Sequence, residues 1–455
     1  MLTYELKKTP ALPLYEALYR CIREDILSGR LPGDSKLPSK RALAQNLEIS
    51  KITVEGAYNQ LLAEGYIRSV EKVGYFVEPV ERPEQRAPQK MQEEPKRQQL
   101  LDLTGNGPAK FPFTVWSKLH RQVMLDLTES LLLPMDNQGI LELRQAIARH
   151  LGQFRGLYVS ADNILVGAGT DFLYNLLIQL LGRDKCYAVE EPGYGKIRKI
   201  YAAGGCRCVS AKMDSRGVDP KGLSQAQVLH ISPAHHFPTG RITDLPRRKK
   251  LLEWMKAKED RYIIEDDYDS EFRFNAHPMP TLASMDTEGR VVYMNTFSKT
   301  LAPSIRISYM VLPEGLMKQF RKKLGFYSCT VPSFEQHTLA RFLEQGYFEK
   351  HINRMRKFYR SRRDRVLTAV QNCSQAEKMT ILEEDAGLHF LIRVQTELSD
   401  AQLVDRCTQT GIRIRALSSY YFGPVPENHT KCLIVNYSGL TDSMFAQLED
   451  LLEKL

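Results

Sequence analysis

Residues 293–310 read YMNTFSKTLAPSIRISYM, an apolar run that leads into a hydroxyl residue, a lysine and a proline-broken turn. Ser298 stands directly before Lys299, and Arg306 follows seven positions later. A lysine that forms an imine with an aldehyde needs a fixed position and a lowered pKa. Because a hydroxyl and a guanidinium can hold a phosphate nearby, the stretch predicts a covalently reactive lysine beside an anion site.

Short apolar runs alternate with helical patterns upstream of this stretch. The runs NILVGAG (163–169), CYAVEEP (186–192), QVLHISP (227–233) and YIIEDDY (262–268) read as buried strands. Strands that alternate with helices are typical of an open α/β sheet. The sequence therefore predicts an α/β fold that ends in a smaller C-terminal α+β part.

The run YIIEDDY places acidic residues where its strand should end. Asp266 can keep a pyridine nitrogen protonated, and Tyr268 can hydrogen-bond an oxygen on the same ring. A Schiff-base lysine with a carboxylate on the ring nitrogen is what pyridoxal 5′-phosphate requires. Lys299 and Asp266 therefore predict this cofactor, with Ser298 and Arg306 near its phosphate.

Two further segments offer contacts to the same cofactor. NILVGAGT runs through a glycine turn into a helix, where the backbone N–H groups of Ala168, Gly169 and Thr170 can receive a phosphate. Tyr194, in EEPGYGK, offers an aromatic face for the ring. Each signal alone is common in proteins without this cofactor, so the prediction rests on their order along the chain.

The chain has 455 residues, 43% of them hydrophobic, and a formal net charge of +9. No apolar run is long enough to cross a membrane, and the N-terminus lacks the apolar core of a signal peptide. We therefore expect a cytoplasmic protein without membrane contacts. Eight scattered cysteines, with no partners at zinc-site spacing, predict reduced thiols and no metal site.

A charged, proline-rich segment at residues 79–99 lacks large apolar side chains and predicts a semi-extended linker. It divides the chain into residues 1–78 and residues 100–455. Residues 1–78 hold 11 Lys and Arg against 10 Asp and Glu. Charge alone therefore gives no reason to expect nucleic-acid binding by the N-terminal piece.

The pattern of the N-terminal piece does give such a reason. Apolar residues recur every four positions in LYEALYRCIREDILSGR (14–30), which predicts one helix face. Ser39 and Ser50 can cap two further helices, and YIRSVEKVGYFVEP (66–79) alternates like two strands around a turn. This layout is that of a winged helix-turn-helix, whose third helix enters the major groove of double-stranded DNA.

Residues 13–76 closely resemble the GntR-type DNA-binding domain, in PLYEAL, LPSKRALA, SKITVEGAY and LLAEGYI among other stretches. Two positions depart from that family, which usually has arginine at Lys51 and often a polar residue at Ile52. Because lysine lacks the bidentate fork of arginine, we expect altered base readout there. The resemblance implies these DNA contacts: Ser39, Lys40 and Arg41 on phosphate, Ser50, Lys51 and Thr53 at the start of the recognition helix, and Lys72 on the wing.

Residues 101–455 resemble fold-type I aminotransferases in the motifs GAGT, PGY, FPTGRI, EDDYDSEF and SKTLAPSIR, which occur in that order. Together the two pieces look like the MocR subfamily of GntR regulators, a helix-turn-helix fused to an aminotransferase-like domain. The resemblance implies Lys299 as the Schiff-base lysine and Asp266 on the pyridine nitrogen. It also implies Ser298 and Arg306 on the phosphate, and a head-to-tail homodimer.

Three positions depart from ordinary aminotransferases. Phe237 stands in place of an asparagine that bonds the ring oxygen, and Ile434 in place of the arginine that clamps the substrate carboxylate. Pro134 stands where a tyrosine commonly reaches the phosphate of the neighbouring subunit. Without the arginine, an amino-acid substrate is poorly oriented, so we expect no full catalytic turnover, with a half-reaction left open.

The favoured hypothesis is a transcriptional regulator in which pyridoxal phosphate, or an amine or amino acid that reacts with it, controls operator binding. Genes of vitamin B6 or amino-acid metabolism would be its targets. Two alternatives stay open, namely an active aminotransferase with an accessory DNA-binding domain and a DNA-binding protein whose large domain holds no cofactor. The basic run at residues 354–365 could also touch DNA, or be a solvated helix face.

Overall fold

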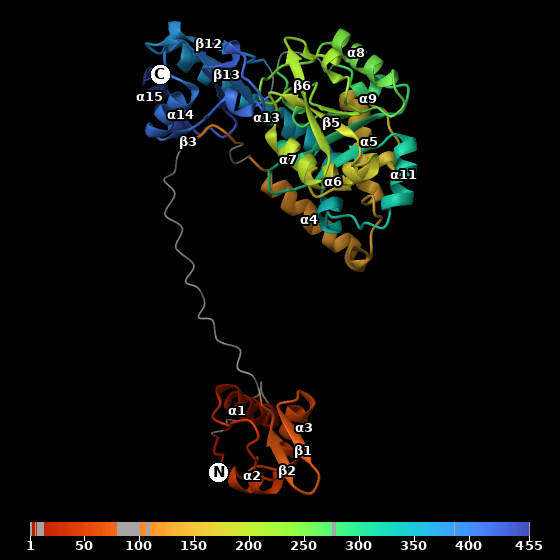
Figure 1. Ribbon diagram of the computed structural model, residues 1–455, viewed down its shortest axis with the longest axis vertical. Coiled ribbons are helices and arrows are strands. Elements are labelled where there is room, and N and C mark those ends of the chain that lie inside the picture. The colour runs from red at the N-terminus through yellow and green to blue at the C-terminus, as the bar shows by residue number, and fades with distance from the viewer. Residues whose placement is uncertain are drawn as a thin grey trace. The chain divides into compact units, whose positions relative to one another are not determined.

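The computed structural model describes residues 2–4, 6, 13–79, 101–105, 110–274, 279–385 and 387–454. The chain forms two compact units, which we call unit 1 (Met1–Lys96) and unit 2 (Arg97–Leu455) (Figure 1). Apart from Pro79, the predicted linker lies outside the described residues. Among the described helices, none is both long and apolar enough to cross a bilayer.

Unit 1 contains a bundle of helices followed by a β-hairpin. Ser39 caps α2 by accepting a hydrogen bond from the Ala42 N–H, and Ser50 caps α3 by accepting one from the Thr53 N–H. Strands β1 and β2 pair antiparallel. These features confirm the predicted winged helix-turn-helix. Its elements are α1 (Leu14–Ser28), α2 (Lys40–Asn46), α3 (Lys51–Ala63), β1 (Ile67–Val70) and β2 (Gly74–Val77).

The apolar core of unit 1 lies between these helices. Leu18 and Ile22 of α1 and Val54 and Leu61 of α3 are fully buried in it. The two residues in each helix are four or seven positions apart, so they lie on one helical face. The opposite face of α3 is therefore left toward solvent.

Unit 2 is built on a mostly parallel sheet with the strand order β4-β11-β10-β9-β8-β5-β6-β7. Within it, β11 runs antiparallel to both of its neighbours, and β7 runs antiparallel to β6. The predicted α/β fold is confirmed. The strands of this sheet are β4 (Ile164–Gly167), β5 (Cys186–Glu191), β6 (Arg207–Asp214), β7 (Gly217–Val218), β8 (Val228–Ile231), β9 (Tyr262–Asp266), β10 (Val291–Thr296) and β11 (Ser308–Val311).

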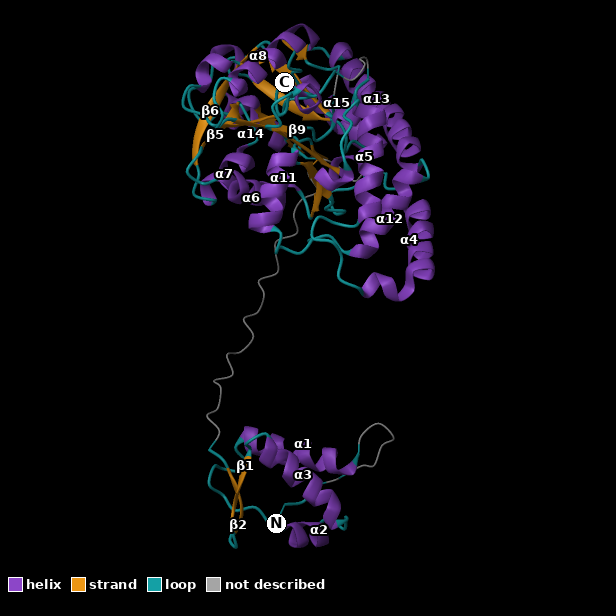
Figure 2. Ribbon diagram, turned by 90° about the vertical axis from the view of Figure 1, so that its right-hand side faces the viewer, coloured by secondary structure: helices purple, strands orange, loops and turns teal. Residues whose placement is uncertain are grey.

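Helices cover both faces of this sheet, with α6, α7 and α11 on one side and α4, α5, α12 and α13 on the other (Figure 2). Val292 and Met294 of β10 pack toward α6 and α11, whereas Tyr293 between them packs in the core on the opposite face. Burial on both faces explains why the central strands are continuous apolar runs. The helices are α4 (Phe113–Leu127), α5 (Leu141–Arg155), α6 (Thr170–Leu181), α7 (Gly195–Ala203), α8 (Leu245–Lys256), α9 (Leu282–Met285), α10 (Phe297–Thr300), α11 (Glu314–Leu324), α12 (Ser333–Glu344) and α13 (Tyr347–Asn372).

The C-terminal part of unit 2 carries a second, antiparallel sheet in the order β12-β13-β16-β15. The start of unit 2 joins this part, because β3 pairs in parallel with β14. The predicted C-terminal α+β part is therefore tied to both ends of unit 2. Its elements are β3 (Leu101–Asp102), β12 (Met379–Leu382), β13 (His389–Val394), α14 (Asp400–Gln409), β14 (Ile412–Arg413), β15 (Arg415–Ala416), β16 (Cys432–Asn436) and α15 (Phe445–Lys454).

Candidate cofactor site and candidate DNA-binding surface

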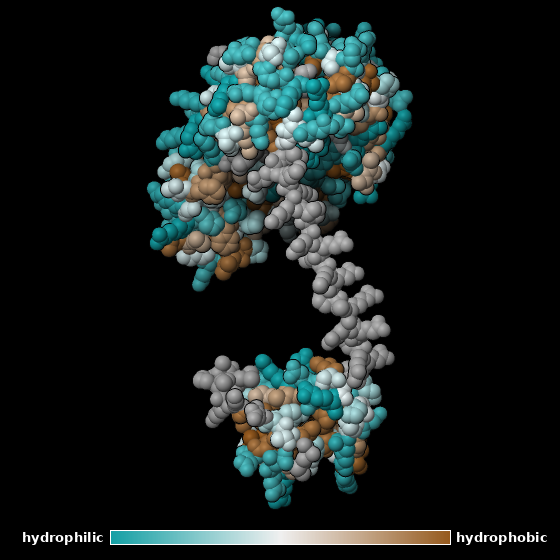
Figure 3. Space-filling model, turned by 90° about the vertical axis from the view of Figure 1, so that its left-hand side faces the viewer, coloured by the Kyte–Doolittle hydropathy of each residue, from teal (hydrophilic) through white to brown (hydrophobic). Residues whose placement is uncertain are grey.

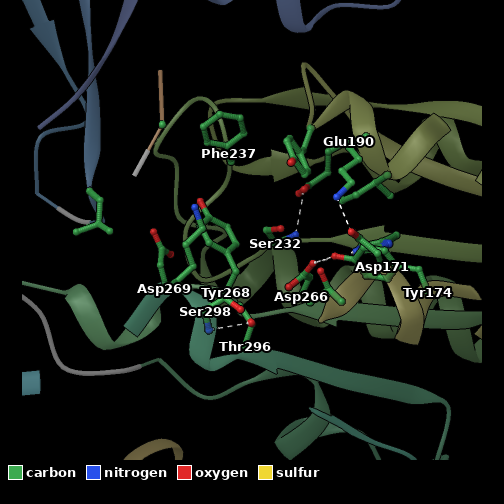
Figure 4. Close-up of a pocket in the computed structure, with 18 of the residues that line it drawn as sticks. Asp171, Tyr174, Glu190, Ser232, Phe237, Asp266, Tyr268, Asp269, Thr296 and Ser298 are labelled. Carbon is green, nitrogen blue, oxygen red and sulfur yellow. Dashed lines mark hydrogen bonds and ion pairs between the residues drawn. The ribbon is translucent and has the colours of Figure 1, made fainter. Parts of the chain in front are cut away.

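A cavity of about 330 Å³ lies at the carboxyl ends of β9 and β10, beside the first residue of α6. Ligands of open α/β sheets bind at such strand ends. The fold brings most of the predicted cofactor residues together here from segments that lie far apart in the sequence (Figure 4). The predicted residues that line the cavity are Thr170, Tyr194, Asp266, Tyr268, Ser298, Lys299 and Arg306.

Asp266 is the last residue of β9 and is buried. Its Oδ2 accepts a hydrogen bond from the hydroxyl of Tyr174 and lies 3.5 Å from Nε2 of His230. Its Oδ1 has no hydrogen-bond partner among the described residues. The carboxylate is therefore fixed in position with one oxygen left to accept a hydrogen bond from a group in the cavity.

Lys299 follows β10 in the short helix α10, and its Nζ lies 5.8 Å from the centre of the Tyr268 ring. Burial lowers the pKa of its ammonium group, and the carboxylates of Asp269 and Asp266 oppose part of that shift. A lowered pKa increases the fraction of neutral amine, which is the form that attacks an aldehyde. The Tyr268 hydroxyl lies 3.2 Å from Nδ1 of His235, within hydrogen-bond distance.

Arg306 and Lys196 bring positive charge to the α6 end of the cavity. Nη2 of Arg306 lies 3.5 Å and Nζ of Lys196 lies 2.5 Å from Oδ2 of Asp171. Gly169, at φ 91°, passes so close to Arg306 that a Cβ at this position would lie 2.1 Å from its Nη2. The guanidinium has room at this place only because residue 169 is a glycine.

Two of the three predicted phosphate-binding amides are already engaged. The Ala168 N–H donates to Oγ1 of Thr330, and the Gly169 N–H donates to the carbonyl of Gly167. Neither residue lines the cavity, whereas Thr170, the first residue of α6, does. A distant segment and a tight turn take up these two N–H groups in this structure, and the contacts of Ala168 and Gly169 to a phosphate stay a prediction.

Aromatic and imidazole side chains line another wall of the cavity. Tyr194 is half exposed, and its ring meets that of Phe237 edge-on at 5.9 Å. Phe237 also contacts His389, whose Nε2 donates to the carbonyl of Pro238. Burial, with a contribution from His235, lowers the pKa of His389 well below its ordinary value, so its imidazole is neutral. This wall offers apolar surface and neutral hydrogen-bonding groups.

Ile434, which the resemblance to aminotransferases places at the position of their substrate-binding arginine, does not line the cavity. It packs in an apolar cluster with Leu391 and Tyr420. Asn436, two positions further along β16, lines the cavity instead. Across the described ranges, Arg306 is the only arginine in the cavity wall.

Several cavity residues were not predicted from the sequence. Tyr174 could have been found, because it lies four positions after Thr170 and so on the same face of α6. His230 and Asn436 carry no comparable signal, since each comes from a strand that reads only as part of the apolar core. The unpredicted residues include Asp171, Tyr174, Glu190, Lys196, His230, Asp269, His389 and Asn436.

The N-terminus of α3 forms the candidate DNA-binding surface of unit 1. Lys51 and Ile52 are exposed there, and Lys72 lies in the turn between β1 and β2 with φ 59°. Lys40 differs, because its Nζ lies 2.7 Å from Oε1 of Glu55 and is held within the unit. The remaining predicted DNA contacts lie at the starts of α2 and α3: Ser39, Arg41, Ser50 and Thr53.

The basic run at residues 354–365 lies within α13 and makes structural contacts. Arg356 donates from Nε to the carbonyl of Glu271, and Arg360 donates to the carbonyl of Phe274. These guanidinium groups are therefore occupied inside unit 2, which favours a structural role for the run.

Comparisons with known proteins agree with this architecture. Residues 14–77 match the bacterial regulatory proteins of the gntR family, and residues 98–454 match aminotransferase class I and II. The chain is 37% identical to the uncharacterized HTH-type transcriptional regulator YdeL of Bacillus subtilis, with 96% of each chain covered. It is 30% identical to the probable rhizopine catabolism regulatory protein MocR of Rhizobium meliloti, over 96% of this chain and 92% of that one.

Among solved structures, the kynurenine aminotransferase of Pyrococcus horikoshii has the same fold as unit 2, with a TM-score of 0.67. It is 24% identical and covers 78% of this chain, with 91% of its own chain matched. The relatives that span both units are named as regulators, which supports a regulator over an aminotransferase with an accessory domain. The chain belongs to the MocR subfamily of GntR-type transcriptional regulators, in which a winged helix-turn-helix is fused to an aminotransferase-like domain.

Proposed function

We propose that unit 2 binds pyridoxal 5′-phosphate through Lys299 and that the state of this site controls operator binding by unit 1. The signal is the cofactor itself, or an amine or amino acid that reacts with it. One observation carries the proposal, namely that a lysine of lowered pKa, the unpaired oxygen of Asp266 and the guanidinium of Arg306 converge on one cavity.

The residues present fit this cofactor. Oγ of Ser298 and Oδ1 of Asp266 are buried without a hydrogen-bond partner among the described residues, and such atoms are rare unless a ligand satisfies them. Asp266 would bond the pyridine nitrogen, while Arg306 and Ser298 would bind the phosphate. When bound, the cofactor supplies an aldehyde for a covalent imine with Lys299 and a ring that withdraws electrons. We assign the remaining contacts to Thr170, Tyr194 and Tyr268.

Control of DNA binding requires a signal that binds two arrangements of the protein with different affinity. We propose that these are two arrangements of a cytoplasmic head-to-tail homodimer on its double-stranded operator. Arg306 is needed for phosphate, and no other arginine among the described residues lines the cavity. The carboxylate of an amino acid therefore finds no free guanidinium in this wall, which favours the cofactor or an amine as the signal. The DNA contacts of this proposal are Ser39, Arg41, Ser50, Lys51, Thr53 and Lys72.

The test traps the covalent bond on the full-length protein. The chain is incubated with pyridoxal 5′-phosphate, reduced with borohydride and digested, and the modified lysine is identified by peptide mass. We expect the label on Lys299, and no label in a Lys299→Ala variant. Lys196→Ala is the matched control, because Lys196 lines the same cavity. In this variant the label should still be found on Lys299.

DNA affinity is then measured on the same preparations with a duplex selected from random sequence. Wild-type protein should change its affinity when the cofactor is added, and Lys299→Ala should not. If the cofactor labels other lysines of Lys299→Ala and still changes DNA affinity, the assignment of Lys299 as the controlling residue is refuted.

A further inference from the structure

Unit 1 exposes an apolar side chain at the start of its recognition helix. Ile52 is 80% exposed, more than any other large hydrophobic residue that the structure describes in unit 1. Leaving an isoleucine side chain in water forgoes the stabilisation that its burial would give. Figure 3 shows hydrophobic residues interspersed with hydrophilic ones on one face of this unit. The core of unit 1 therefore does not account for an isoleucine at this position.

The geometry of α3 turns Ile52 away from that core. Val54 and Leu61 point inward and are fully buried. At 100° per residue, Ile52 lies roughly opposite them, on the same face as Asn59, which is also exposed. In a helix-turn-helix the N-terminal residues of this helix contact base edges in the major groove. Ile52 and Asn59 are therefore placed on the face that meets the bases.

An isoleucine can neither donate nor accept a hydrogen bond, which limits what it can read. The major groove presents donors and acceptors on every base pair, and its one apolar group is the 5-methyl of thymine. Lys51 beside it is exposed and cationic, which suits the phosphate-lined groove and does not suit an apolar protein partner. We infer that Ile52 packs against a thymine methyl and sets a preference for thymine at one position of each half-site.

This inference rests on the proposed function of unit 1, because it needs a bound duplex. The experiment starts by selecting duplexes from a random-sequence pool with the full-length protein. Each thymine of the selected duplex is then replaced singly by deoxyuridine, which removes only the 5-methyl group. At one position per half-site we expect affinity to fall about fourfold, because the complex no longer buries one apolar group of methyl size.

Ile52→Ala and Ile52→Thr test whether this loss belongs to Ile52. Both variants should show a smaller difference between thymine and deoxyuridine duplexes at that position, because Ala keeps only the Cβ and Thr replaces the ethyl arm of isoleucine by a hydroxyl. Leu27→Ala is the matched control, since Leu27 is an exposed apolar residue of α1 that is 40% exposed. It should keep the fourfold difference, and the melting temperatures of all variants verify folding.

Two results separate the outcomes. If the wild-type protein ignores the thymine methyl at every position, or if Ile52→Ala keeps the difference, the role of Ile52 is refuted while DNA binding stands. If no duplex is enriched from the pool, the DNA-binding function itself fails and the inference falls with it.

Discussion

The backbone at Gly169 lies close to the guanidinium of Arg306, which lines the cofactor cavity, and Gly169→Ala tests the role of this close approach. A Cβ at this residue would lie 2.1 Å from Nη2 and 2.6 Å from Cζ of Arg306. Both distances are far below van der Waals contact, so the guanidinium must leave its position. Its charge-assisted hydrogen bond to a ligand phosphate, about 1.5–3 kcal/mol, should be lost. Affinity for pyridoxal 5′-phosphate should then fall about 10- to 150-fold.

The backbone itself adds a cost that must be separated from this loss. Gly169 has φ 91° and ψ 161°, a region that only glycine adopts readily, so alanine costs about 1–3 kcal/mol of folding stability. Gly156→Ala is the matched control, because Gly156 has φ 62° and a Cβ there meets nothing within 4 Å. It should cost about 1–2 kcal/mol of stability and leave cofactor affinity unchanged.

The assay is a titration of each variant with pyridoxal 5′-phosphate and with pyridoxal, followed by absorbance. Pyridoxal lacks the phosphate, so Gly169→Ala should bind it nearly as well as the wild-type protein does. An equal loss for both ligands would mean that the substitution disturbs the whole cavity. Unchanged affinity for the phosphate form would refute the role given to Arg306.

Three further predictions follow from the contacts and charges in the structure. Asp269→Asn removes a carboxylate that raises the pKa of Lys299, so the pH midpoint of its reaction with pyridoxal should move to lower pH, and an unmoved midpoint would exclude that coupling. Burial raises the pKa of Glu271 to about 7 from 4.5. The folded state then binds more protons than the unfolded state between these values, so stability should fall by up to about 3 kcal/mol as pH rises through this window. The free energy of unfolding of Glu271→Gln, measured with urea, should not fall over this pH range. If it falls as much as that of the wild-type protein, Glu271 is not the cause. Lys51→Ala should reduce the slope of log DNA affinity against log salt concentration by about the contribution of one phosphate contact. Lys40→Ala should reduce this slope less in the same titration, because the ammonium of Lys40 is paired with Glu55.

Local chemistry made much of this molecule predictable from its sequence. Ser39 and Ser50 could be recognised as helix caps because the cap bond joins residues two or three positions apart. Asp266 and Lys299 could be placed at strand ends because buried parallel strands are short apolar runs with polar residues at their exits. Each of these signals is contained in a few consecutive residues.

Contacts between distant segments could not be predicted in this way. The Ala168 N–H looked available for phosphate, but Thr330, 162 positions away, takes its hydrogen bond. Lys40 read as a phosphate contact, and its pairing with Glu55 depends on how α2 packs against α3. In both cases the partner of the polar group is set by the tertiary fold, which a few consecutive residues do not reveal.

The contacts of the basic run of α13 also depend on the tertiary fold and could not be predicted from the sequence. Arg356 and Arg360 bond to the carbonyls of Glu271 and Phe274, in the segment that directly follows Asp266 and Tyr268. A loop at the end of a strand has carbonyls that no strand partner satisfies, and buried carbonyls need a donor. The arginines supply these donors from a long helix packed on the sheet. Positive charge that reads as a nucleic-acid signal in sequence thus holds in place the backbone that carries the cofactor residues.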